Sequence, residues 1–266
     1  MIDVPPLPDR SPVSVILPTY NRAHYLREAI DSVLRQDHPS LELIVVDDGS
    51  TDVTPSVLEG YGAQLTTLRQ ANRGVGAARN AGVARARGAL VAFLDDDDLW
   101  EPDKLSLQAK FLAAHPATDV VYGHMRQFAS PELTDEVRAR FRHLDGQVLP
   151  SPLPTSMLIR RAAFERVGPF DETLQIGVEM DWHARMQDAG LSMTMLDDVV
   201  YRRRLHPGGM NASRPHDQHE RVEVLRRVLA RRRAAASAAS AAPAIPPSAD
   251  SPAENRQPTP DPRSRS

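Results

Sequence analysis

Four consecutive carboxylates, Asp95–Asp98, directly follow an apolar run and carry the clearest chemical signal in this sequence. Side chains alternate in direction along an extended segment, so Asp95 and Asp97 are expected to point the same way. Placing like charges together is costly unless a cation or another positive group neutralises them. Mg²⁺ and Mn²⁺ prefer oxygen ligands and commonly take further ligands from substrate phosphates. The run therefore predicts a divalent-cation site, and the alternative is an acidic loop that caps the helix entered at Pro102.

A second pair of acids, Asp47 and Asp48, ends another apolar run and precedes Gly49 and Ser50. Glycine and serine here indicate a capped turn, which accounts for those two residues but not for both acids. One carboxylate could instead accept hydrogen bonds from a nucleotide base or ribose, and both interpretations stay open. Arg79 could bind phosphate or form a surface ion pair. The glycines just before it lack the Gly-Lys-Ser/Thr of a phosphate-binding loop.

An alternation of strands and helices positions these polar residues. Short apolar runs rich in β-branched residues predict strands, and apolar residues at helical spacing predict helices between them. The predicted strands cover residues 13–18, 42–48, 64–69 and 89–95, and the predicted helices cover 21–36, a segment ending near 59, 74–88 and 102–114. This order is typical of an α/β fold with a doubly wound, mostly parallel sheet and helices on both faces. Ligands of such sheets bind beyond the carboxyl ends of the strands, where the acids lie.

The second half of the chain gives weaker patterns. Residues 119–125 predict a strand, and a helix is expected to begin at Ala162. Residues 129–150 form a polar stretch that is expected to be irregular and could fold over the site.

The two ends differ in composition from the rest. Residues 1–12 are proline-rich and expected to be extended, and residues 234–266 are nearly all Ala, Ser and Pro. That tail has too few bulky side chains to repay the entropy of ordering, so it is predicted to be disordered. The helix predicted at 216–233 is either a closing helix with a solvated rim or a basic amphipathic helix that lies on an anionic membrane. Its apolar stripe, which lies among arginines, consists of Val222, Leu225 and Leu229.

Composition limits the classes of function. A chain of 266 residues that is 41% apolar can bury a core, and its net charge of −3 argues against a nucleic-acid binder. The absence of cysteine excludes a disulfide framework, a thiolate metal site and a cysteine nucleophile. The proline-rich start lacks the apolar run of a signal peptide, and no segment approaches the roughly 20 apolar residues of a membrane span. The expected location is cytoplasmic, with peripheral contact at the inner face of the membrane as an alternative.

Four linked segments carry a resemblance to a known family. They read SVILPTYNRAHYLREAIDSVLRQ, ELIVVDDGSTD, NRGVGAARNAGVARARGALVAFLDDDDLWEPDKL and VGPFDETL. In this order, from about Val13 to His206, the chain resembles glycosyltransferase family 2, whose members have the GT-A fold. The resemblance implies a glycosyltransferase domain over 13–233, divided into a nucleotide-sugar-binding half at 13–115, a variable acceptor half at 116–215 and a C-terminal basic helix at 216–233.

By this resemblance, a nucleotide-diphosphate sugar, carrying UDP or a similar nucleotide, lies across the strand ends as donor. Asp48 would hydrogen-bond a uracil-type ring, the segment from Pro18 to Tyr20 would frame the base, and Arg22 would lie nearby. The expected donor-binding residues are Pro18, Thr19, Tyr20, Arg22, Asp48, Arg79, Asp95 and Asp96.

Asp95 and Asp97 match the outer acids of the family's Asp-x-Asp metal motif. The resemblance implies that Asp97 binds the divalent cation, Mn²⁺ or Mg²⁺, directly. Asp95 would contact ribose or a metal-bound water, and Asp96 would touch the donor sugar or face solvent. His206 resembles a histidine that some members use as a further metal or diphosphate contact, and a surface or core position is its alternative.

The catalytic base is also expected from the resemblance. The family usually opens a helix with Glu-Asp-x-Asp and places an arginine four residues later. Registering this chain on Asp181 and Arg185 puts Glu179 at the base position and Val178 where an acid is usual. Glu179 is the first candidate base and Asp181 the second, while Asp181 and Arg185 also have the spacing of a structural ion pair. The alternative is a solvated helix start with favourable N-terminal acids.

The implied enzyme is an inverting glycosyltransferase of the hexosyltransferase type. A single displacement at the anomeric carbon needs a base for the acceptor hydroxyl and a cation for the departing diphosphate. The acceptor could be a glycan, a lipid-linked intermediate, a peptide or a small metabolite. A non-catalytic sugar-nucleotide or glycan-binding module of the same fold is one alternative, which Val178 favours. A nucleotidyltransferase is another, although no basic glycine-rich loop follows the first strand.

Overall fold

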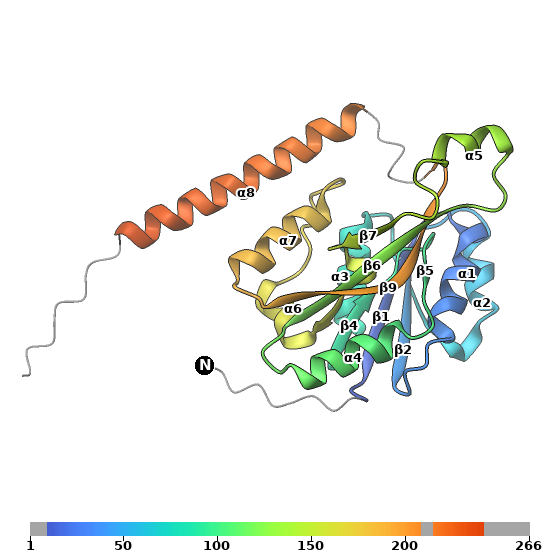
Figure 1. Cartoon of the computed structure of the whole chain (residues 1–266), viewed down its shortest axis with the longest axis horizontal. Coiled ribbons are helices and arrows are strands. Elements are labelled where there is room, and N and C mark those ends of the chain that lie inside the picture. The colour runs from blue at the N-terminus through green and yellow to red at the C-terminus, as the bar shows by residue number, and fades with distance from the viewer. Residues whose placement is uncertain (1–9, 209–214, 242–266) are drawn as a thin grey trace, which may run out of the picture.

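The computed structural model describes residues 10–208 and 215–241. Within these residues the strands join into a single nine-stranded sheet with helices packed on both of its faces (Figure 1). The α/β class and the mostly parallel sheet are therefore as predicted.

The first half of the sheet is entirely parallel. Strand β1 (Val13–Thr19) lies between β2 (Leu41–Asp47) and β4 (Leu90–Phe93), and β2 also pairs with β3 (Thr66–Arg69). The four predicted strands and four predicted helices of this half are confirmed with small shifts at their ends. The helices are α1 (Ala23–Leu34), α2 (Thr54–Glu59), α3 (Val75–Arg85) and α4 (Lys104–Ala114), with a short 3-10 turn at Gly62–Gln64.

Burial of β1 on both faces explains the layered arrangement. Leu17 packs with Leu26 of α1 on one side, and Ile16 packs with Ala78 of α3 on the other. Gly82 of α3 lies so close to Ile16 that a β-carbon there would collide with it. The small residues of α3 thus allow this helix to lie directly on the strand.

The second half adds antiparallel strands. Strand β8 (Leu158–Arg160) pairs antiparallel with both β4 and β6 (Val120–Ala129), and β6 runs parallel to the long β9 (Met193–Leu205). Two short strands complete the sheet: β5 (Leu99–Trp100) beside β9 and β7 (Val148–Ser151) beside β6. The order across the sheet is β3-β2-β1-β4-β8-β6-β9-β5, with β7 next to β6.

The prediction that residues 129–150 are irregular is wrong, because this stretch contains α5 (Asp135–Phe141) and most of β7. Thr134 caps α5 by accepting a hydrogen bond from the Val137 N–H, and two acids occupy its first turn. No residue of α5 is buried, so this helix needs no apolar stripe, and its sequence lacks the periodicity that predicts a helix. The remaining helices of this half are α6 (Arg161–Val167) and α7 (Val178–Asp188).

The C-terminal helix α8 (Pro215–Ala241) is longer than the helix predicted at 216–233. The prediction of disorder from 234 onward is therefore wrong as far as Ala241. Alanine has the highest helix propensity, so an Ala-rich segment readily continues a helix that has already formed. The other residues of the predicted end segments, 1–9 and 242–266, lie outside the described residues.

The face that packs α8 onto the domain differs from the predicted stripe. Val224 and Val228 are buried. The stripe of Val222, Leu225 and Leu229 is instead 44%, 48% and 52% exposed. Among the described residues, no helix combines the length and apolar character that crossing a bilayer requires.

Candidate active site

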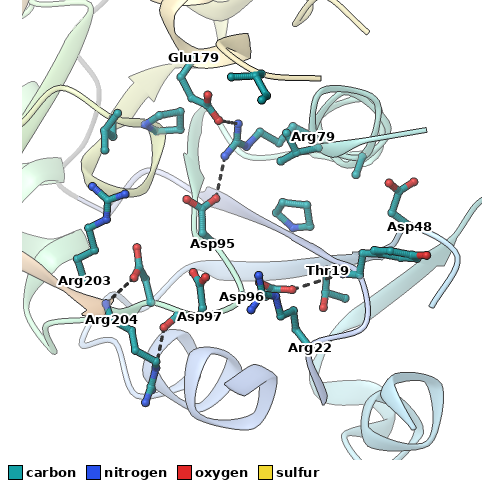
Figure 2. Close-up of a pocket in the computed structure, with 18 of the residues that line it drawn as sticks. Thr19, Arg22, Asp48, Arg79, Asp95, Asp96, Asp97, Glu179, Arg203 and Arg204 are labelled. Atoms are coloured by element: carbon teal, nitrogen blue, oxygen red, sulfur yellow. Dashed lines mark hydrogen bonds and ion pairs between the residues drawn. The ribbon is translucent and has the colours of Figure 1, made fainter. Parts of the chain in front are cut away.

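A cavity of about 720 Å³ opens beyond the carboxyl ends of β1, β2 and β4 (Figure 2). It collects residues that are far apart in the sequence, from the first strand to the end of β9. Of the predicted site residues, only Asp181 is not in its wall. Those that line it are Pro18, Thr19, Tyr20, Arg22, Asp48, Arg79, Asp95, Asp96, Asp97, Glu179 and His206.

The four acids after β4 form a turn rather than the predicted extended segment, since the Asp98 N–H donates to the Asp95 carbonyl at 3.2 Å. Asp95 and Asp97 both reach the cavity, but each has different partners. Asp98 is buried, and its Oδ1 accepts a hydrogen bond from the Arg204 N–H at 2.9 Å. Its burial and the nearby Asp97 and Asp95 charges raise its pKa well above the ordinary value. Asp98 therefore holds the turn against β9.

Asp97 and His206 form the pair that best fits a divalent cation. Asp97 Oδ2 lies 3.0 Å from His206 Nε2. Burial would raise the pKa of Asp97, but the His206 hydrogen bond and the charges of His206 and Arg22 outweigh it and lower the pKa. In contrast, burial and the Asp97 charge raise the pKa of Asp96 to about 8. Crowded carboxylates of this kind are relieved by a cation.

A cation here would need ligands beyond the protein. In residues 10–208 and 215–241, no three His, Asp or Glu side chains are grouped as a preformed metal site. Asp97 and His206 could supply one oxygen and one nitrogen ligand. Mg²⁺-type ions commonly keep waters and take substrate phosphates as further ligands, so this donor set fits a cation that binds together with a diphosphate.

A buried arginine, Arg79, joins the acidic turn after β4 to the start of α7 across the cavity. Arg79, only 1% exposed, donates from Nη2 to Asp95 Oδ1 at 2.8 Å and from Nη1 to Glu179 Oε1 at 2.6 Å (Figure 2). Thr155 Oγ1 donates to the other Asp95 oxygen at 3.0 Å. Burial alone would raise the pKa of Glu179, but the Arg79 charge and hydrogen bond reverse the effect and lower it. Glu179 is therefore held as a carboxylate facing the cavity.

Asp48 serves the loop beside the cavity. Its Oδ1 accepts hydrogen bonds from Gln70 Nε2 and the Arg73 N–H, and its Oδ2 accepts one from the Gly74 N–H at 2.8 Å. These bonds fix the entry into α3, where Gly74 has a φ of 88° that disfavours other residues. Asp47 caps the turn at Ser50, whose N–H it accepts at 2.8 Å. The turn-capping interpretation therefore holds for Asp47 alone, Asp48 anchors the loop that enters α3, and base recognition by Asp48 stays a prediction.

The two candidate bases on α7 have opposite surroundings. Glu179 faces the cavity, whereas Asp181 is 6% exposed and ion-paired. Asp181 Oδ2 accepts from Arg185 Nε and its Oδ1 from Arg231 Nη1, each at 2.9 Å. The predicted structural pair with Arg185 is thus present. Glu179 is the better placed of the two to meet a substrate.

The arginines at the end of β9 are divided between cavity and surface. Arg203 and Arg204 line the cavity, and Arg202 lies by Glu101, with Nε 3.6 Å from Oε1. Arg204 is engaged with Glu28 at 2.8 Å. Arg203 faces the cavity (Figure 2).

Part of the cavity wall was not identified from the sequence. The second half supplies mostly apolar side chains that gave no chemical signal by themselves. They are Phe141, Pro152, Leu153, Pro154, Ile176 and Met180. His183 is a further polar residue of this wall, and burial lowers its pKa.

A parallel sheet with acids at its carboxyl edge, extended by antiparallel strands that close the cavity, is the GT-A arrangement. Solved structures with this fold include TarS of S. aureus in complex with UDP-GlcNAc, which has a TM-score of 0.65 and 24% identity over 82% of this chain and 65% of TarS 1–349. The mannosyltransferase PcManGT from Pyrobaculum calidifontis, solved with GDP-Man and Mn²⁺, has a TM-score of 0.59 and 25% identity over 92% of this chain and 79% of its own.

The family model for glycosyl transferase family 2 matches residues 14–168, more than half of the chain, so this chain belongs to that family. An uncharacterized glycosyltransferase of Rickettsia prowazekii, RP339, is 33% identical over 64% of this chain and 56% of its own length. The putative teichuronic acid biosynthesis glycosyltransferase TuaG of Bacillus subtilis is 44% identical over 38% of this chain and 41% of its own. The chain thus spans about half the length of these relatives.

Proposed function

We propose that this protein is an inverting glycosyltransferase that moves a sugar from a nucleotide-diphosphate sugar to an acceptor hydroxyl. The observation that carries the proposal is the Arg79 bridge. It holds Glu179 ionised on one side of the cavity and Asp95 at the acidic strand end on the other. A base and a diphosphate-binding edge that face one space are what a single displacement requires.

The donor lies along the carboxyl ends of the first-half strands. Tyr20 is 45% exposed at the cavity and offers its ring to the base, with Pro18 and Thr19 beside it. Asp97 and His206 would hold the divalent cation, and Asp95 would contact ribose or the bound cation's hydration shell. When bound, the cation stabilises the negative charge that develops on the departing diphosphate. Arg203 adds a positive charge at the same edge of the cavity.

Glu179 takes the proton of the acceptor hydroxyl as that oxygen attacks the anomeric carbon. The bond to the diphosphate oxygen breaks in the same step, so the anomeric configuration inverts. Arg79 keeps Glu179 deprotonated before the reaction, at the expense of its basicity. Because the arginine also contacts Asp95, it fixes the base relative to the donor site.

The acceptor enters from the second half of the fold. The part of the wall that the second half supplies includes the apolar side chains of Leu153, Ile176 and Met180, of which Met180 directly follows Glu179 in the chain. This lining favours an acceptor with an apolar surface beside its hydroxyl, whether that acceptor is a glycan, a lipid-linked intermediate, a peptide or a small metabolite.

Turnover with defined donors tests the proposal. The protein is incubated with Mn²⁺ and a panel of UDP- and GDP-sugars, and release of the nucleoside diphosphate is measured for the wild type and for Glu179→Gln. Loss of a general base costs about 10²- to 10⁴-fold, so the variant should fall by at least about 100-fold. Glu172→Gln is the matched control, because Glu172 also pairs with an arginine, Arg73, and is not among the residues that line the cavity.

The same assay separates the proposal from a non-catalytic sugar-nucleotide-binding module. That second candidate is favoured by Val178, which is buried at 1% exposure where the family usually has an acid. Donor binding without diphosphate release in any pairing would support it. Equal rates for the wild type and Glu179→Gln would instead reject Glu179 as the base.

Peripheral contact with the inner face of a membrane is a further part of the proposal. It would use the exposed stripe of Val222, Leu225 and Leu229, beside which Arg233 is exposed on α8. Such a helix can place apolar side chains in a bilayer and arginines near anionic headgroups. Co-sedimentation with vesicles that contain phosphatidylglycerol, compared with phosphatidylcholine vesicles, tests this contact.

A further inference from the structure

Helix α8 lies along α7, the helix that carries Glu179, and contacts it near both ends (Figure 1). At the start of α7, the Val224 side chain covers Gly177, where a β-carbon would lie 3.1 Å from Val224 Cγ2. At the end of α7, Arg232 Nε donates to Asp188 Oδ1 at 2.6 Å. None of the described residues of α8 lines the cavity, so any effect of α8 on the site is indirect, and α7 is the element that joins the two.

The central contact is the ion pair of Arg231 with Asp181. Arg231 Nη1 lies 2.9 Å from Asp181 Oδ1, and its Nε lies 3.4 Å from Asp188 Oδ2. The Asp181 side chain is 9% exposed, and Arg185 holds its other oxygen. A carboxylate in this position has two cations at fixed directions, one from its own helix and one from α8.

The start of α7 is anchored in the core by Val178 and Trp182, which are each 1% exposed, and α8 adds two further contacts to it. The helix starts after Gly177, which has a φ of 77° and provides no side-chain cap. Asp181 lies two residues beyond Glu179, within the same first turn of the helix. The two contacts from α8, Val224 on Gly177 and Arg231 on Asp181, therefore enclose the base from both sides along the chain.

We infer that Arg231 is a positioning residue, which fixes the first turn of α7 so that Glu179 meets Arg79 and the acceptor hydroxyl. This inference rests on the proposed role of Glu179 as base. On this view α8 belongs to the catalytic unit. A misplacement of about 1 Å at a reacting group can cost about 10²-fold in rate. A contact remote from the reacting atoms can therefore still change kcat.

The experiment compares Arg231→Gln with Arg226→Gln in the full chain. Arg226 lies on the same helix, and its ion pair, 3.6 Å long, is with Glu223 of α8 itself. We expect kcat of Arg231→Gln to fall by about 10- to 100-fold with the donor KM unchanged, because the proposed donor contacts come from elements other than α7 and α8. Arg231→Lys should restore part of kcat, and Arg226→Gln should match the wild type. The rates are measured below the unfolding transition of every variant.

A second readout does not depend on turnover. Backbone amide exchange over residues 178–182 should accelerate in Arg231→Gln and stay unchanged in Arg226→Gln. Faster exchange at these amides together with the kcat loss supports the inference. If Arg231→Gln only lowers the melting temperature and leaves both kcat and these amides as in Arg226→Gln, the residue is merely structural and the inference is wrong. If the wild type releases no diphosphate but the exchange result holds, the proposed function fails while the positioning contact stands.

Discussion

Replacing Arg79 with glutamine tests the reasoning about the site most directly, because this side chain has both a structural and a catalytic role. Glutamine keeps a polar, similarly extended group but removes the charge that faces two carboxylates. Those partners, Asp95 and Glu179, are 30% and 19% exposed, so water can compensate only part of the loss. Removing one partner of a buried ion pair costs about 3–5 kcal/mol. With Thr155 still donating to Asp95, we expect a loss near the lower end, about 3 kcal/mol.

The pH dependence of this loss has a definite sign. The pKa of Glu179 in the folded protein lies below its ordinary value of 4.5. The stabilisation from its ion pair is therefore present above pH 4.5 and is lost as the pH falls through the lowered native pKa. The difference in unfolding free energy between the wild type and Arg79→Gln should be largest near neutral pH and should shrink below pH 4.5.

The activity of Arg79→Gln should change in a related way. Without the arginine, burial is the main influence left on Glu179 and raises its pKa. Since the base must be deprotonated, the acidic limb of the kcat profile should move to higher pH. Urea unfolding at several pH values and kcat from pH 4 to 8 measure the two effects.

Arg73→Gln is the control for Arg79→Gln. Arg73 precedes α3 and pairs with Glu172, but its side chain is 61% exposed. Surface ion pairs of this kind contribute under about 1 kcal/mol to the free energy of unfolding, so Arg73→Gln should cost little stability. A stability loss for Arg79→Gln no larger than that for Arg73→Gln, or an acidic limb that does not move, would refute the assigned role of the bridge.

Three further outcomes are expected. His206→Asn should raise the Mn²⁺ concentration for half-maximal turnover by about tenfold or more, measured by metal titration, while a donor KM at saturating metal stays similar. Gly82→Ala should destabilise the fold by about 1–3 kcal/mol in urea unfolding, because the added methyl group collides with Ile16 on β1, and unchanged stability would contradict the close packing of α3. Burial lowers the pKa of Lys104 well below 10.5. Between the native and the unfolded pKa, the unfolded chain therefore binds a proton that the native chain does not bind. In that range the unfolding free energy should rise with pH, by up to about 1.4 kcal/mol per pH unit toward pH 10. Lys104→Met should remove that slope, and an identical slope in the variant would show that Lys104 is charged in the native state.

The first half of the fold could be predicted because its signals are local. Strands β1, β2 and β4 are short apolar runs buried on both faces, and the helices between them have their own apolar periodicity or turn residues. The antiparallel insertion of β8 beside β4 has no such signal. It depends on pairing of Ala92 with Leu158, which are far apart in the sequence, and an apolar run does not specify its partner.

The acids of the site could also be predicted, because they follow strands whose ends must meet. The Arg79 bridge could not be predicted, since one of its two partners lies 100 residues away. The packing face of α8 was missed for a similar reason. Its sequence offers two apolar stripes, and the one that contains Val224 and Val228 is buried because the same face also carries Arg231 toward Asp181.

The unusual Val178 has a structural explanation that agrees with a functional base. Its side chain packs in the core formed by α3 and α7, so that a β-carbon on Gly76 would lie 3.4 Å from Val178 Cγ1. Arg79 lies about one turn beyond Gly76 on α3, and Glu179 directly follows Val178 on α7. Arg79 and Glu179 form the ion pair. An acid at 178 would place a charge in this apolar contact, and the nearby buried Arg79 already has two carboxylate partners. The valine therefore supports the close approach of the two helices that brings Arg79 to Glu179, and its presence does not indicate that the base has been lost.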